Sequence, residues 1–264
     1  MTSDIVERVL RSSRYRSVDA ALVARLADEE LPKARNADDA VKRVKRRLHQ
    51  AVGAFRPGRR EAELEWPTGD PVALRAACRA AMRGHASTRE RLPHIGTFYR
   101  GIWDVTGIPN RLLDLGCGLD PLALPWMRLP ADATYLATDV DAGSLEVVGG
   151  FLDAVGQPHL VEARDLVDDA AVPAADVALL LKLVTTLDRQ DPAAAGRVLE
   201  ALPVRHAVVS FAARSLGGRG GGREKTYRDR LDRLVAGSER VRAVADASVP
   251  NELVFVLTLD SLGG

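Results

Sequence analysis

The stretch that most constrains the fold of this chain runs from Arg111 to Pro121 and reads RLLDLGCGLDP. A short apolar run that ends in an acid and turns through Gly-x-Gly is typical of a buried parallel strand. Such a strand feeds a tight turn, where missing side chains let a ligand approach the backbone. A second predicted strand, residues 133–138, is followed by Asp139. That spacing of about twenty residues is the one at which a carboxylate meets the ribose hydroxyls of an adenosine-type cofactor.

The Gly-x-Gly turn alone would also fit an ordinary strand-to-helix connection. The longer pattern is more specific: DLGCG at residues 114–118 and TDVD at residues 138–141 resemble the first two motifs of class I S-adenosylmethionine-dependent methyltransferases. The pattern lacks the third glycine of a dinucleotide fingerprint. The sequence therefore favours methyl transfer over hydride transfer.

The rest of the second half alternates between strands and helices, as a doubly wound sheet requires. We predict helices at 143–155, 191–201 and 225–236, and strands at 159–163, 176–181, 206–212, 240–247 and 252–259. The last two strands form the terminal hairpin that is typical of a seven-stranded methyltransferase sheet. The expected fold class is α/β, a Rossmann-like class I methyltransferase.

The chain has no basic-then-apolar leader, and no run reaches the roughly 20 apolar residues of a membrane span. We therefore expect a cytoplasmic protein that does not bind membranes. The two cysteines, Cys78 and Cys117, are too few for a disulfide framework or a metal cluster. No metal is expected.

Charge is distributed unevenly along the chain. Residues 1–110 hold 21 Lys and Arg against 14 Asp and Glu, whereas the remainder holds 16 against 22. A basic first part joined to an acidic second part suggests that the first holds a polyanionic partner and the second acts on it.

The first part is predicted to be wholly helical, with helices at 4–16, 18–31, 37–55 and 71–83. In the second helix, Arg25 shares a face with Leu22 and Leu26. In the third, Lys42, Arg43, Arg46 and Arg47 lie opposite an apolar stripe that starts at Val41. Such a face can be merely solvated, but five further arginines favour contacts with nucleic-acid phosphates: Arg14, Arg16, Arg56, Arg59 and Arg60.

Two further segments are candidates for the site. Residues 85–93, HASTRERLP, predict a capping box between Ser87 and Glu90 that opens the next helix. The box leaves Arg89 and Arg91 unexplained, and a guanidinium beside the glycine turn could bind a cofactor carboxylate through two hydrogen bonds. Residues 214–225 form a glycine-rich basic loop, which is either a linker or a clamp on a substrate backbone.

Several of these stretches together resemble the aminoglycoside-resistance 16S rRNA methyltransferases of the Arm/Rmt/Sgm type. The matching segments are 42–49, 85–93, 114–121, 125–127, 176–182, 215–217 and 251–253, so the resemblance spans nearly the whole chain. It implies a basic, helical, rRNA-binding domain at residues 1–105 and a methyltransferase domain at residues 106–264. It also implies methylation of N7 of guanine 1405 in the 30S ribosomal subunit, with S-adenosyl-L-methionine as cofactor.

The resemblance assigns roles by motif. Arg91 would bind the cofactor carboxylate, Gly116 and Gly118 its methionine and ribose, Asp139 the ribose hydroxyls, and Asp165 with Leu166 the adenine. Lys182 would position the target base. The predicted RNA-binding residues are Arg14, Arg43, Arg46, Arg47, Lys182, Arg219, Arg223 and Lys225. One departure from the family pattern is Asp120, which stands where the family has Asn, and its role is open.

Guanine N7 carries a lone pair and no hydrogen, so we expect a direct displacement that needs no general base. Two alternatives stay open. One is a methyltransferase that acts on another base, such as adenine N1, or on a small natural product. The other is a non-catalytic RNA-binding relative. The basic first part argues against a small substrate, and the intact cofactor motifs argue against a non-catalytic protein. We expect a monomer.

Overall fold

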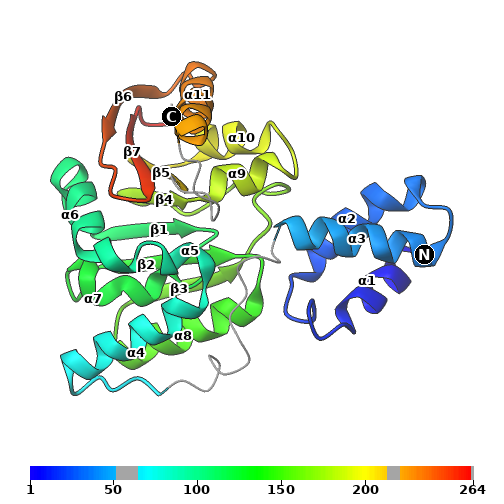
Figure 1. Cartoon of the computed structure of the whole chain (residues 1–264), viewed down its shortest axis with the longest axis horizontal. Helices are drawn as coiled ribbons and strands as arrows, with labels where there is room; N and C mark the ends of the chain where they lie inside the picture. Colours follow the sequence, from blue (N-terminus) through cyan, green and yellow to red (C-terminus); the bar gives the residue numbers. More distant parts are fainter. Residues whose placement is uncertain (52–64, 213–220, 263–264) are drawn as a thin grey trace.

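The computed structural model describes residues 1–51, 65–212 and 221–262. Figure 1 shows a larger α/β body and a smaller body of three N-terminal helices beside it. The larger body contains a seven-stranded sheet in the order β3-β2-β1-β4-β5-β7-β6. The strands are β1 (Arg111–Leu115), β2 (Thr134–Asp139), β3 (His159–Ala163), β4 (Val177–Leu181), β5 (His206–Ala212), β6 (Val241–Asp246) and β7 (Glu252–Leu259).

The first five strands are parallel, and β7 runs antiparallel to both of its neighbours. This is the predicted methyltransferase sheet, with its terminal hairpin. The chain builds outward from β1 to β3 in one direction and from β4 to β5 in the other. The strand order therefore reverses between β1 and β4, which is where doubly wound sheets bind ligands at their carboxyl ends.

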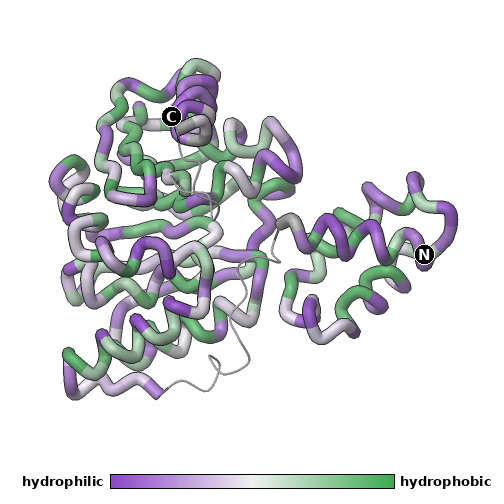
Figure 2. The backbone as a smooth tube through the Cα atoms, in the orientation of Figure 1, coloured by the Kyte–Doolittle hydropathy of each residue, from purple (hydrophilic) through white to green (hydrophobic). Residues whose placement is uncertain are grey.

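Both faces of the central strands are covered, which explains why strands such as β4 and β5 are apolar runs rather than alternating ones. Successive residues of β1 point to opposite faces: Leu112 packs into one core and Leu113 into the other. The first core includes α8 (Ala142–Val155) and the second α9 (Leu183–Asp188), α10 (Ala194–Ala201) and α11 (Gly221–Ala236). Figure 2 shows hydrophobic strands inside and hydrophilic residues on α11 outside.

The N-terminal helices form a core of their own. They are α1 (Thr2–Leu10), α2 (Ala20–Glu30) and α3 (Ala37–Ala51), and their buried residues include Val9, Leu22 and Leu48. The predicted helix 4–16 is wrong in length, because α1 ends at Leu10 and the chain turns before a β-bridge at Val18. The predicted helix 37–55 is confirmed as far as residue 51, and the rest of it lies outside the described residues.

Helices α4 (Pro71–Gly84), α5 (Ala86–Arg89) and α6 (Ile95–Thr106) lie on the larger body with α7 (Leu124–Met127). Their buried residues, such as Met82 and Phe98, share the core of β1 and β2. The helices up to α3 thus share one core and those from α4 onward pack in the cores of the larger body. The domain boundary after residue 105 stays a prediction. In the described part of the chain, no helix is long and apolar enough to cross a membrane.

Candidate active site

The turn after β1 is built so that only glycine fits its two key positions. Gly116 has φ +61° and Gly118 has φ +51°, a region that other residues seldom adopt. A Cβ atom on Gly116 would lie 2.7 Å from Leu183 Cδ1, and one on Gly118 would lie 2.8 Å from His85 Cε1. Both glycines also line a pocket, so a ligand can approach the backbone of the turn there, as the sequence predicts.

A pocket opens beside this turn, at the carboxyl ends of β1, β2 and β4. Its lining includes Gly116, Gly118, Asp139, Asp165, Leu166 and Lys182, which are five of the six predicted cofactor residues and the predicted target-positioning lysine. The lining also includes the apolar side chains of Leu183 and Leu187. A carboxylate beside a glycine turn and an apolar wall fit the ribose and adenine of an adenosine-type cofactor.

Asp139 is fixed at the end of β2 by backbone donors. The Gly118 N–H donates to Asp139 Oδ2 at 2.9 Å, and the Asp141 N–H donates to Oδ1 at the same distance. Burial raises the pKa of the Asp139 carboxyl, and these backbone hydrogen bonds act against that rise. Each carboxylate oxygen has a second lone pair, so both can still accept a ribose hydroxyl.

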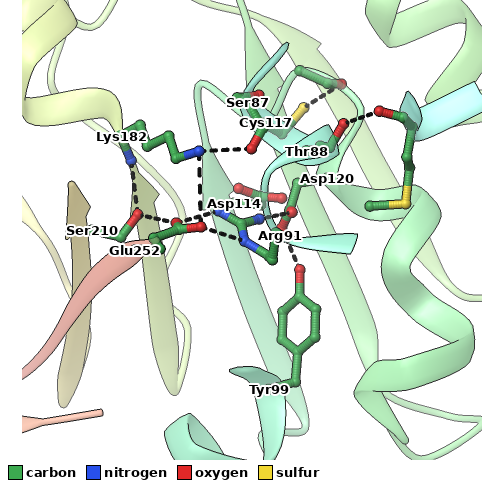
Figure 3. A network of polar contacts seen from close by, with 12 residues as sticks. Ser87, Thr88, Arg91, Tyr99, Asp114, Cys117, Asp120, Lys182, Ser210 and Glu252 are labelled. Atoms are coloured by element: carbon green, nitrogen blue, oxygen red, sulfur yellow. Dashed lines mark hydrogen bonds and ion pairs between the residues drawn. The ribbon is translucent and has the colours of Figure 1, made fainter. Parts of the chain in front are cut away.

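A buried ionic network lies behind the turn (Figure 3). Arg91, whose residue is only 2% exposed, donates from Nε and Nη2 to the Glu252 carboxylate at 3.1 and 2.6 Å. Its Nη1 donates to Asp120, and its Cζ lies 4.2 Å from the centre of the Phe98 ring. Arg91 is not among the residues that line the pocket. Its predicted contact with the cofactor carboxylate stays a prediction.

The structure gives a role to Asp120, the departure from the family pattern. Its carboxylate accepts hydrogen bonds from Arg91 and from the Tyr99 hydroxyl, the latter at 2.8 Å. Burial raises the pKa of Asp120 and outweighs the opposing effects of Arg91 and Tyr99. Burial would also raise the pKa of Glu252, but the charges of Arg91 and Lys182 hold it below its usual value. The carboxylate at position 120 is thus paired with the Arg91 guanidinium and does not stand near the pocket as an unpaired negative charge.

Lys182 follows β4 with φ +60°, an unusual conformation for a residue with a side chain, and its N–H donates to the Ser210 carbonyl at 3.1 Å. Its Nζ donates to the Ser87 carbonyl at 2.8 Å and to Glu90 Oε2 at 2.7 Å, and lies 3.9 Å from Glu252 Oε2. The predicted capping box is therefore wrong. Ser87 lies inside α5, which has His85 as its N-cap, and Glu90 instead binds the lysine.

The predicted RNA-binding residues differ in how free their charges are. Arg46 is exposed. Arg14 is also exposed, and its Nη2 lies 2.9 Å from His49 Nδ1. The remaining described residues pair with acids: Arg43 with Asp39 and Glu30, Arg47 with Glu29 and Glu30, and the exposed Lys225 with Asp229. Arg219 and the side chain of Arg223 lie outside the described part. RNA binding by this set stays a prediction.

Sequence reasoning missed three residues that shape the site. Glu252 and Ser210 bind each other across β7 and β5, with Ser210 Oγ donating to Glu252 Oε1 at 2.6 Å. A charged residue at the start of an otherwise apolar strand was the signal for Glu252. Arg25 reaches Asp165 from α2, with its Nε 2.7 Å from Oδ2. The sequence feature that could have identified Arg25 was its position as a charged residue on the apolar face of a helix.

The sheet, the glycine turn and an acidic residue at the end of β2 define a class I methyltransferase. Residues 11–256 match the family of ribosomal RNA methyltransferases (FmrO). The chain is 42% identical over 262 residues to the 16S rRNA (guanine(1405)-N(7))-methyltransferase of Frankia casuarinae, with 95% of this chain and 91% of that protein covered. The chain therefore belongs to the ribosomal RNA methyltransferase (FmrO) family.

Other relatives agree with this assignment. The chain is 37% identical to the 16S rRNA (guanine(1405)-N(7))-methyltransferase of Micromonospora echinospora, over 96% of this chain and 95% of that protein. The crystal structure of the 16S rRNA methyltransferase RmtF in complex with S-adenosyl-L-homocysteine superposes with a TM-score of 0.83. It is 32% identical in sequence, and 98% of each chain is covered.

Proposed function

We propose that this protein methylates N7 of guanine 1405 in 16S rRNA, with S-adenosyl-L-methionine as the methyl donor, and thereby confers aminoglycoside resistance. The observation that carries this proposal is the pocket, which brings five predicted cofactor residues and Lys182 to one place. Relatives that cover nearly the whole chain bear the name of this activity. We further propose that a monomer acts on the 30S subunit in the cytoplasm, where that substrate is.

Within the pocket, the side chains of this chain bind and orient. Asp139 would hold the two ribose hydroxyls, Leu166 and Leu187 would cover the adenine, and Asp165 would fix the loop beside it. When bound, S-adenosyl-L-methionine supplies a methyl group on a positively charged sulfur. Guanine N7 attacks with a lone pair that carries no proton, so no side chain has to act as a general base.

The remaining task is to hold the target base about 3 Å from the methyl group after the base has left its helix, at a cost of a few kcal/mol. Lys182 lines the pocket and is the residue that we propose for this positioning. Trp126, an aromatic residue of the matching segment 125–127 that could stack on a base, lies instead in a separate cleft with Gly107 and Ile108, next to the amino end of β1. Among the predicted RNA-binding residues that the structure describes, the exposed Arg14 and Arg46 are the ones that we propose to bind rRNA phosphates.

The proposed activity predicts one methylated nucleotide in cells that express the protein. Mass mapping and primer extension of 16S rRNA should place the modification at N7 of guanine 1405, and resistance to aminoglycosides should accompany it. The Asp139→Ala protein serves as the control and should leave this nucleotide unmodified. A methyl group on another nucleotide, or on adenine N1, would refute the assignment.

Asp139→Ala is also expected to weaken binding of S-adenosyl-L-homocysteine about tenfold or more, because hydrogen bonds to a charged group contribute roughly 1.5–3 kcal/mol. Isothermal titration calorimetry measures this affinity directly. Asp153→Ala is a matched control, since Asp153 is an acid on α8 whose side chain is 78% exposed. Unchanged affinity in the Asp139→Ala protein would remove Asp139 from the ribose site.

A further inference from the structure

The N-terminal helical body, α1 to α3, contacts the larger body at the rim of the cofactor pocket. The Asp19 N–H donates to the Val140 carbonyl at 2.8 Å, and the Ala142 N–H donates to the Ser17 carbonyl at 2.7 Å. The Ser17 hydroxyl donates to Asp141 Oδ1 at 2.6 Å. Because Val140 and Asp141 line the pocket directly after Asp139, the position of the helical body and the shape of the ribose site depend on each other.

Arg25 makes a second link, on the adenine side. Its side chain, 16% exposed, projects from α2, and its three nitrogens bind three different acceptors. Nε donates to Asp165 Oδ2 at 2.7 Å, Nη2 to Gln190 Oε1 at 3.0 Å, and Nη1 to Glu29 Oε1 at 2.8 Å. Asp165 and Gln190 both line the pocket, one after β3 and the other after α9. One guanidinium therefore joins two separate walls of the site.

The carboxylate that Arg25 holds is itself buried, with its side chain 7% exposed. Its other oxygen accepts a hydrogen bond from the Val167 N–H at 3.1 Å, so Asp165 spans the backbone of the loop that carries Leu166. Removing the guanidinium would leave a buried charge without its cation, and the loop would have to move to hydrate it. A lysine cannot replace Arg25, because a single ammonium lacks the planar fork that reaches three acceptors.

The link continues to the basic face of α3. Glu29 accepts from Arg25 through Oε1 and from Arg47 through Oε2, the latter at 3.1 Å. Arg47 also donates to the Gln190 carbonyl at 3.4 Å. A phosphate that bound Arg47 would compete with Glu29 for it and would leave Glu29 to Arg25 alone. Such a phosphate would thus reinforce the orientation of Arg25 towards Asp165.

We infer that Arg25 is a positioning residue of the cofactor pocket, and that through it the helical body couples rRNA binding to cofactor binding. The inference deepens the proposed function and rests on it for the identity of the two ligands. Coupling between two sites is reciprocal and amounts typically to 5–150-fold in affinity. A 30S subunit should therefore raise the affinity for the cofactor, and the cofactor should raise the affinity for the subunit by the same factor.

The test compares the wild-type protein with Arg25→Gln, Arg25→Lys and a matched control. Arg11→Gln removes the same charge from the same body, at an exposed residue directly after α1 that pairs with Glu7 of that helix. Calorimetry with S-adenosyl-L-homocysteine should show affinity at least about fivefold weaker in both Arg25 variants and unchanged in Arg11→Gln. With saturating 30S subunits, equilibrium dialysis should show at least about a fivefold gain for the wild type and little gain for Arg25→Gln.

Further variants separate positioning from simple loss of structure. Asp165→Asn combined with Arg25→Gln should lose no more affinity than the worse single variant, because both changes break one interaction. If Arg25→Gln fails to fold, Gln190→Ala removes one of the three bonds without leaving a buried charge and should still weaken binding of S-adenosyl-L-homocysteine.

If Arg25→Gln binds S-adenosyl-L-homocysteine as tightly as the wild type does, the positioning role is overturned. If 30S subunits leave the wild-type affinity for S-adenosyl-L-homocysteine unchanged, the coupling is overturned. Both readouts measure binding without turnover. A failure to methylate guanine 1405 would therefore refute the proposed function alone and leave the positioning role of Arg25 to be judged by calorimetry.

Discussion

Arg91→Ala is expected to lower the free energy of unfolding by about 3–5 kcal/mol, the usual cost of removing one partner from a buried ion pair. Arg91 is the cation between two buried carboxylates, Asp120 and Glu252, whose side chains are 4% and 1% exposed. Without it, both would have to be protonated or hydrated inside the core. Because domains of this kind are stable by only about 5–15 kcal/mol, urea denaturation should show a large fall in the midpoint.

Arg89→Ala is the matched control for this change, since Arg89 is an exposed arginine two residues earlier, at the end of α5. Its effect should stay within about 0.5 kcal/mol. Arg91→Lys should remain well below the wild type, because an ammonium cannot bind Glu252 through two parallel hydrogen bonds. A fall of less than about 1 kcal/mol in Arg91→Ala would mean that the network is hydrated rather than dry.

The sequence predicted the central strands of the sheet well because they are buried on both faces. The run VALLL of β4 and the three leucines of β1 are apolar whichever neighbours they pair with, so local composition is enough to find these strands. The glycine turn was equally predictable, since positive φ at Gly116 and Gly118 is a local requirement. With Asp139 at the end of β2, these features located the pocket before any tertiary contact was known.

The missed contacts are those whose partners lie far apart in the chain. Arg25 and Asp165 are separated by 140 residues, and Lys182 and Glu90 by 92. Nothing in the local pattern at either residue identifies the other. The capping box failed for this reason, because Ser87 and Glu90 had the right spacing for a local bond but Glu90 instead binds Lys182, which follows β4.

The end of α1 is a related case. Residues 11–16 carry no proline or glycine to stop a helix, and local propensity favoured a longer one. The chain turns there because Ser17 and Asp19 hydrogen-bond to the segment after β2, so tertiary contacts override propensity. The same override produced the contact between the two bodies, which the sequence did not predict.

Lys182→Ala is expected to reduce the single-turnover rate of methylation about 100-fold while changing the affinity for S-adenosyl-L-homocysteine by only a few fold. The ammonium of Lys182 binds the Ser87 carbonyl and Glu90, and so ties α5 to the end of β4 at the pocket. Its loss would leave Glu90 and Glu252 near the pocket without that cation, which would repel rRNA phosphates. The target base would then be poorly placed, and misplacement by about 1 Å can cost a factor of 100.

The measurement uses saturating 30S subunits and cofactor, so that the rate reports the chemical step and not binding. Lys33→Ala is the control, since Lys33 is a lysine of the helical body whose side chain is 56% exposed and pairs with Glu30 at 3.3 Å. It should methylate as fast as the wild type. Because guanine N7 gives up no proton, the wild-type rate should also stay nearly flat from about pH 6.5 to 8.5. A Lys182→Ala rate within threefold of the wild type would exclude Lys182 from positioning, and a tenfold rise with pH would indicate an acceptor atom that bears a proton.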